Sequence, residues 1–149
     1  MYIHTISSSP VGLNALEKIL SGDVRLELSP DAMDCIAACR NFLDNKMRVP
    51  GELIYGVNTG FGALYNVAIG TRELEQLQKN LVMSHACGVG DQVPKEIVRL
   101  MLFLKIQSLS YGYSGVQPET VIRLMDFFNQ GIYPVVYEQG SLGASGDLA

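Results

Sequence analysis

Prolines that can start helices and glycines that can end them recur along this 149-residue chain and constrain its fold more than any other feature. Proline is favoured in the first turn of a helix, and glycine is favoured just past the last turn. Apolar residues at helical spacing fill the segments between these markers. They predict helices over about residues 10–21, 30–45, 71–88, 94–110 and 118–131, of which the one from Pro94 is expected to be the longest. The expected fold class is therefore mainly α.

The first half of the chain also contains extended segments. Apolar and charged residues alternate over residues 24–28, which is typical of a half-buried strand. A second short, strand-like run covers residues 53–55. We therefore expect a small mixed α/β region over about residues 1–70, which leads into a helical region over about residues 71–149. That helical bundle is expected to be incomplete in this chain.

The composition limits the classes of molecule that the protein is expected to bind and the cellular compartment in which it is expected. With 48% hydrophobic and 17% charged residues, the chain has the composition of a globular domain. The net charge of −4 disfavours binding to nucleic acid or to an acidic membrane surface. The N-terminus lacks the pattern of an export signal, and Arg99 and Lys105 interrupt the most apolar stretch. We expect a cytoplasmic protein, not bound to a membrane, whose partner is a small neutral or zwitterionic molecule.

The three cysteines support a reducing compartment, because an odd number cannot all form internal disulfides. Cys35 and Cys39 would share one face of a helix, where they could pack as apolar residues or hold a metal ion. His4 and His85 are the only histidines available to complete a metal site. Packing is the favoured interpretation, and no metal is expected.

Ala144, Ser145 and Gly146 have the side chains that backbone cyclisation needs. In a compressed loop, the amide nitrogen of Gly146 can attack the carbonyl carbon of Ala144, since a residue without Cβ permits that approach. Loss of one water closes a five-membered ring. Loss of a second water from the side chain of Ser145 leaves an exocyclic methylene. The product is an electrophile that a nucleophilic substrate can attack.

Other interpretations of this loop are less specific. Gly, Ser and Asp are common in turns, and Ser145 could simply begin a helix. The loop lacks the final glycine of a G-x-S-x-G nucleophile elbow, so a hydrolase serine is not supported. Cyclisation is the interpretation for which other segments of the chain provide further support.

Two further segments are candidates for a site. Residues 55–62 place three glycines around Tyr55 directly after a strand-like run, in a loop suited to close approach. Gly60 and Gly62 are not followed by a further glycine at the spacing of a dinucleotide-binding loop, nor by the Lys-Ser/Thr pair of a phosphate-binding loop. His85 lies among small residues near the end of a predicted helix, where it could be a structural residue or could contact a ligand.

Four stretches together resemble the aromatic amino acid ammonia-lyase family. They are residues 55–62, 77–90, 112–115 and 140–149, and the resemblance spans most of the chain. One departure is Tyr137, where the family commonly has a proline.

The resemblance implies a carbon–nitrogen lyase whose electrophile, methylideneimidazolone, forms from Ala144, Ser145 and Gly146 without an added cofactor. The pair Ser84-His85 resembles that of family members acting on histidine, which implies release of ammonia from L-histidine to give trans-urocanate. Tyr55 would be the general base, and His85 would orient the substrate.

Alternatives remain open at this point. A tyrosine or phenylalanine ammonia-lyase, an aminomutase and a non-catalytic helical module all fit parts of the pattern. Family members are longer and build each active site from several subunits of a homotetramer. Residues 1–149 are therefore expected to be the N-terminal portion of a lyase domain, inactive by themselves.

Overall fold

A computed structural model of the chain describes residues 1–49, 51–60, 62–70 and 73–140, without the side chains of Ser21 and His85. Contacts along the chain divide it into two compact units. The first consists of Met1–Asp44 and Val93–Val135, and the second of Asn45–Gln92 and Val136–Ala149.

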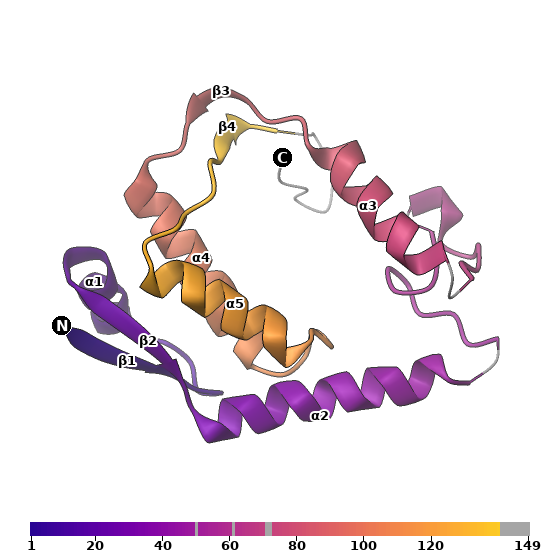
Figure 1. The fold of residues 1–149 in the computed structure, drawn as a ribbon, viewed down its shortest axis with the longest axis horizontal. Coiled ribbons are helices and arrows are strands. Elements are labelled where there is room, and N and C mark those ends of the chain that lie inside the picture. Colours follow the sequence, from indigo (N-terminus) through magenta and orange to yellow (C-terminus); the bar gives the residue numbers. More distant parts are fainter. Residues whose placement is uncertain (50, 61, 71–72, 141–149) are drawn as a thin grey trace. The chain divides into compact units, whose positions relative to one another are not determined.

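The first unit contains most of the helices and a small parallel sheet (Figure 1). Its elements are β1 (Tyr2–Ile6), α1 (Leu13–Ser21), β2 (Val24–Leu28), α2 (Pro30–Met47, whose end belongs to the second unit), α4 (Lys95–Ser110) and α5 (Pro118–Asn129). Strands β1 and β2 pair in register from Tyr2 with Val24 to Ile6 with Leu28. The expected strand over residues 24–28 is confirmed, and β1 is an element that the periodicity did not indicate.

The free edge of β2 is covered by the side chain of Asn129 at the end of α5. Its Oδ1 accepts a hydrogen bond from the Leu26 amide at 2.8 Å, and its Nδ2 donates to the Leu26 carbonyl at 3.0 Å. A side-chain amide thus replaces a neighbouring strand, so these two backbone groups are paired inside the protein.

The core of the first unit lies between the sheet and the helices α4 and α5. Phe103 and Ile106 of α4 and Val121 of α5 are fully buried, together with Ile6 and Leu26 of the sheet. This burial explains why α4 and α5 are amphipathic, because each presents its apolar residues to the same core.

The second unit contains a short 3₁₀ turn η1 (Gly62–Leu64), the helix α3 (Leu74–His85) and a small antiparallel sheet of β3 (Val89–Gln92) and β4 (Tyr137–Gln139). Residues 52–54 form no strand, and residues 55–58 form a turn. The expected strand-like run at 53–55 was therefore wrong. Side-chain hydrogen bonds shape this segment instead, as described below.

The mainly helical fold class is confirmed, and all five predicted helices are found, although several of their ends differ. α1 begins at Leu13, since Gly12 and not Pro10 precedes its first turn. α3 ends at His85 and not near Gly88. The longest of the described helices is α2 with 18 residues, whereas α4 has 16. Among the described residues, no helix is both long enough and apolar enough to cross a membrane.

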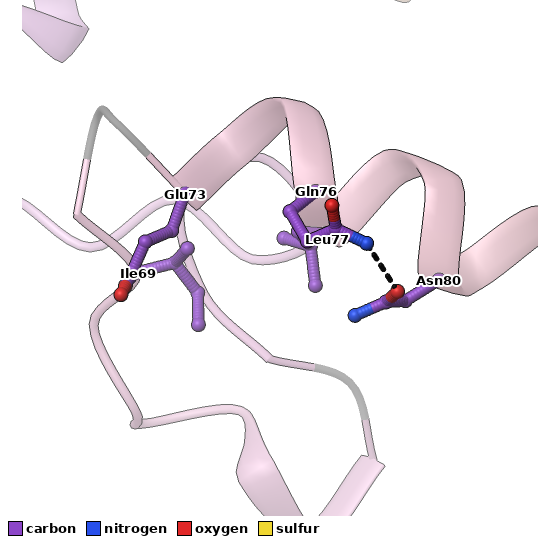
Figure 2. Close-up of a pocket in the computed structure, with 5 residues that line it drawn as sticks. All are labelled: Ile69, Glu73, Gln76, Leu77 and Asn80. Carbon is purple, nitrogen blue, oxygen red and sulfur yellow. Dashed lines mark hydrogen bonds between the residues drawn. The ribbon is translucent and has the colours of Figure 1, made fainter.

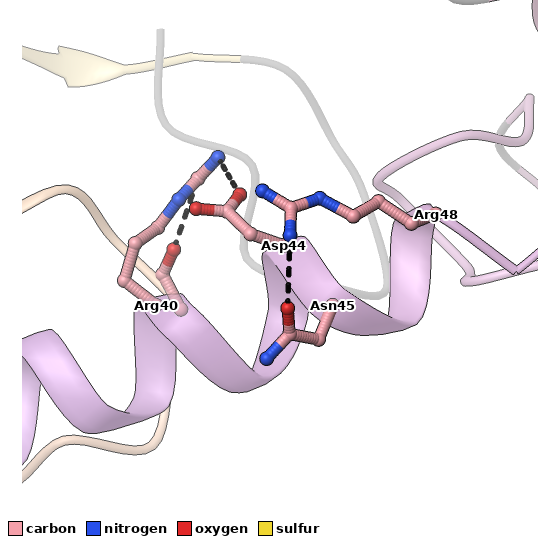
Figure 3. Close-up of polar contacts among 5 residues, drawn as sticks. Arg40, Asp44, Asn45 and Arg48 are labelled. Carbon is pink, nitrogen blue, oxygen red and sulfur yellow. Dashed lines mark hydrogen bonds and ion pairs between the residues drawn. The ribbon is translucent and has the colours of Figure 1, made fainter.

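The turn at residues 112–115 lies directly against α2. A Cβ on Gly112 would lie 2.7 Å from the carbonyl oxygen of Cys35, so no side chain fits there. Arg40 donates a hydrogen bond to the Gly115 carbonyl at 3.3 Å and pairs with Asp44 at 2.6 Å, as Figure 3 shows for the ion pair. Arg40 and Asp44 are four residues apart and therefore lie on one face of α2, where their ion pair holds the guanidinium next to the turn at residues 112–115.

The pH dependence of folding in the first unit should depend on His4. Burial lowers the pKa of its ring below the usual value, and the buried Nε2 has no hydrogen-bond partner among the described residues. The unfolded state therefore binds the proton more readily, so stability is present above about pH 6.5 and is lost as the pH falls below it. In urea unfolding measured between pH 8 and pH 5, replacing His4 by Phe should reduce the change in the free energy of unfolding with pH. An equal slope in the variant would contradict the assignment.

Candidate active site

The loop that carries Tyr55 is held by two polar side chains of the same segment. Asn58 Oδ1 accepts a hydrogen bond from the Ile54 amide at 2.7 Å, and its Nδ2 donates to the Glu52 carbonyl at 2.9 Å. Thr59 is fully buried, and its hydroxyl accepts from the Gly56 amide at 3.2 Å and donates to the Gly60 carbonyl at 2.9 Å. Such side-chain bonds give the backbone an alternative to strand pairing. They are the reason that the segment is a turn.

Gly60 is required by a close approach. A Cβ at this position would lie 2.6 Å from the Cβ of Leu64 and 2.8 Å from the Leu64 carbonyl oxygen. Neither group can move freely, since one is close to the backbone and the other is part of it. An isolated bridge between Thr59 and Ala68 closes the same loop. The glycine-rich sequence thus permits a tightly folded loop, as its composition predicts.

Tyr55 lies on the outside of this loop with 63% of its surface exposed. Its hydroxyl oxygen accepts a hydrogen bond from the Gly62 amide at 3.3 Å. This bond fixes the position of the hydroxyl oxygen, while most of the side chain stays open to solvent. The arrangement suits a group that must accept a proton from a molecule approaching from solvent.

Replacing Asn58 by Ala should loosen the Tyr55 loop. The variant loses two side-chain hydrogen bonds to the backbone, which are worth about 0.5–1.5 kcal/mol each. We expect the amide of Ile54 to exchange its hydrogen faster, and the free energy of unfolding to fall by about 1–2 kcal/mol. Asn66→Ala is the matched control, since Asn66 is exposed in the same segment. Equal exchange rates in the two variants would show that Asn58 does not hold the loop.

The second predicted site residue, His85, is the last residue of α3. The hydroxyl of its neighbour Ser84 donates to the Leu81 carbonyl at 2.8 Å, a bond back into the last turn of the helix. The side chain of His85 and the whole of Ala144, Ser145 and Gly146 lie outside the described residues. Tyr55 and His85 belong to the second compact unit.

A recess beside the first turns of α3 was not predicted from the sequence. Figure 2 shows Ile69, Glu73, Gln76, Leu77 and Asn80 around a pocket of about 270 Å³. Gln76 Nε2 donates to Asn80 Oδ1 at 2.8 Å, so the two amides form one polar wall a single turn long. Their spacing of four residues places them on one helix face and could have indicated this pair.

Comparison with known proteins decides the family. The model of the aromatic amino acid lyase family matches residues 11–149. The chain belongs to the aromatic amino acid lyase family. This lyase-family chain is 44% identical over 149 residues to the histidine ammonia-lyase of Streptomyces griseus, and 50% identical over 119 residues to that of Geobacillus thermodenitrificans. These matches cover 99% and 80% of the chain, but only 29% and 23% of the two relatives.

Two solved structures share the fold of this chain. The histidine ammonia-lyase of Trypanosoma cruzi has a TM-score of 0.82 at 32% identity, over 95% of this chain and 27% of that one. The ergothionase of Treponema denticola has a TM-score of 0.86 at 26% identity, over 93% and 28%. The family expectation is thereby confirmed, and the chain spans less than a third of the length of these relatives.

Proposed function

We propose that this chain is the N-terminal part of a histidine ammonia-lyase, which releases ammonia from L-histidine and yields trans-urocanate. The observation that carries the proposal is the similarity to curated histidine ammonia-lyases, at 40–50% identity. The complete enzyme would be a cytoplasmic homotetramer. Its partner is a small amino acid, and the chain supplies part of each active site.

The reaction is difficult because the β-proton of histidine is weakly acidic and its amine is a poor leaving group. Ala144, Ser145 and Gly146 would supply the electrophile, methylideneimidazolone, which activates the amine by covalent attachment. These residues fit in composition, because Gly146 provides an unhindered amide and Ser145 a hydroxyl that can leave as water.

Tyr55 would remove the β-proton. The exposed position of its side chain and the hydrogen bond from the Gly62 amide, which fixes the hydroxyl oxygen, support this role. His85 would orient the imidazole of the substrate from the end of α3.

A chimera tests the proposed function. This chain replaces the matching segment of the Streptomyces griseus histidine ammonia-lyase, to which it is 44% identical. We expect urocanate production from L-histidine, with the unmodified relative as the positive control. A folded tetrameric chimera without urocanate production, although the relative is active, would contradict the proposal.

An aminomutase of the same family is the second candidate. The phenylalanine aminomutase of Pantoea agglomerans has a TM-score of 0.83 at 29% identity over 99% of this chain. Such an enzyme returns ammonia to the β-carbon. Product analysis of the chimera with phenylalanine, tyrosine and histidine separates the two candidates, because only a mutase yields a β-amino acid.

Substrate preference should depend on His85. Replacing His85 by Leu in the chimera would remove a hydrogen-bonding partner of the substrate, and the loss of one such partner costs about 1–3 kcal/mol, or roughly 10- to 100-fold in discrimination. We expect kcat/KM for histidine relative to phenylalanine to fall by that factor. An unchanged ratio would show that His85 does not select the substrate.

A further inference from the structure

Burial in the second unit is concentrated in the loop that carries Tyr55. Among the described residues of that unit, only Thr59 and Gly60 are buried. None of the surface of Thr59 is exposed, whereas the apolar residues Leu53 and Leu64 of the same unit are about half exposed. The side chain that is buried most completely here therefore carries a hydroxyl group, although apolar side chains are available nearby.

The buried hydroxyl of Thr59 both accepts and donates a hydrogen bond within the loop. It accepts from the Gly56 amide at 3.2 Å and donates to the Gly60 carbonyl at 2.9 Å. Burying a hydroxyl without partners costs free energy, so these two bonds are what makes threonine acceptable at this position. Valine has nearly the same shape and would need no partner. What threonine adds to packing is therefore the link between the two glycines.

This link acts on both ends of Tyr55. Gly56 directly follows Tyr55, so the bond from its amide to Thr59 fixes the peptide group next to the Tyr55 backbone. At the other end, the Tyr55 hydroxyl oxygen accepts from the Gly62 amide at 3.3 Å. Gly62 lies two positions after Gly60, whose carbonyl the Thr59 hydroxyl holds. The backbone of Tyr55 and the donor to its hydroxyl are thus tied to one buried side chain.

Thr59 is itself held by backbone pairing on either side. The Gly60 amide donates to the Val67 carbonyl at 3.1 Å, and the Ile69 amide donates to the Asn58 carbonyl at 2.9 Å. These two bonds join the residues before and after Thr59 to the returning segment of the loop. A side chain anchored in this way gives a fixed position to the groups with which it forms hydrogen bonds.

We infer that Thr59 is a positioning residue for Tyr55. The inference rests on the proposed function, in which Tyr55 removes the β-proton of the substrate. A general base must lie within hydrogen-bond reach of the proton that it removes, and a misplacement of about 1 Å can cost about 100-fold in rate. Because the Thr59 side chain is buried, it acts on Tyr55 and not on the substrate. Its loss should therefore lower kcat and leave KM nearly unchanged.

Kinetics of the chimera test the role of the hydroxyl. Thr59→Val keeps the shape of the side chain and removes both bonds, so we expect kcat for L-histidine to fall about tenfold, with KM within about twofold of the parent. Thr59→Ser, which keeps the hydroxyl, should restore most of the parent kcat. Thr5→Val is the matched control, because Thr5 is an exposed threonine of β1 in the first unit.

Two kinetic results would overturn the inference. One is an unchanged kcat in the Thr59→Val chimera. The other is an equal loss of kcat in Thr59→Ala and Thr59→Ser, since both lack the methyl group and only serine keeps the hydroxyl. This second comparison holds even where Thr59→Val does not fold.

Hydrogen exchange in the 149-residue chain gives a readout that needs no lyase activity. The Gly62 amide donates to the Tyr55 hydroxyl, so its exchange rate reports whether Tyr55 is in place. Tyr55→Phe removes this acceptor and should raise the rate about 2- to 10-fold. Thr59→Val should raise it toward the same value, whereas Thr59→Ser should keep the parent rate.

The two readouts separate failure of the inference from failure of the proposed function. If the proposed function is wrong, the parent chimera makes no urocanate, and the Gly62 exchange rates still follow the expected order. If the positioning role is wrong, the parent chimera is active, and Thr59→Val leaves the Gly62 exchange rate of the chain unchanged.

Discussion

Replacing Ser145 by Ala should abolish the electrophile and with it the lyase activity. The second water of the ring-forming reaction comes from the Ser145 side chain, and alanine has no hydroxyl to lose. In the chimera, we expect the intact mass of the parent to be two waters below the mass of its sequence, with the deficit at residues 144–146. The variant should lack the exocyclic methylene, and its kcat should fall on the order of 10³-fold or more.

Ser108→Ala is the matched control, because Ser108 is an exposed serine on α4, in the first unit. Its mass deficit and activity should equal those of the parent. Substantial urocanate production by the Ser145→Ala variant would reject the cyclisation chemistry. The intact mass of the 149-residue chain alone tests whether cyclisation occurs without the rest of the enzyme. A deficit of two waters there would show that these residues compress the loop without the rest of the enzyme.

Replacing Tyr55 by Phe should leave the electrophile formed and remove most of the turnover. The change deletes one hydroxyl from a side chain that is 63% exposed, so the fold should be retained. Loss of a general base typically costs about 10²- to 10⁴-fold in rate. We expect the mass deficit at residues 144–146 to persist in the chimera, while kcat falls within that range and KM changes little.

Tyr65→Phe provides the comparison for this prediction. Tyr65 belongs to the same unit and is also 63% exposed, but it has no predicted role. Both variants remove the same atom from an equally exposed ring. A similar activity in the two variants would exclude Tyr55 as the base, whereas loss confined to Tyr55→Phe would support it.

The sequence predicted the local structure around Tyr55 and His85 to different degrees, whereas Ala144–Gly146 lie outside the described residues. The glycine spacing around Tyr55 correctly predicted a tightly folded loop, because close approach depends on residues a few positions apart, such as Gly60 and Leu64. The position of His85 at the end of α3 also followed from local helix signals. The roles of Asn58 and Thr59 in holding the loop were missed, since side-chain bonds to nearby amides compete with the strand that the apolar run suggested.

The helices and the family could be predicted from the amino-acid sequence, because helix-start and helix-end residues and each of the four family motifs are patterns of neighbouring residues. Which segments contact one another became known from the folded chain alone. Examples are the pairing of β1 with β2 and the close approaches of Gly112 to Cys35 and of Gly88 to Tyr137. These contacts join residues that are far apart in the chain. No local periodicity encodes them, because each depends on the packing of a whole unit and on the space that a missing Cβ leaves.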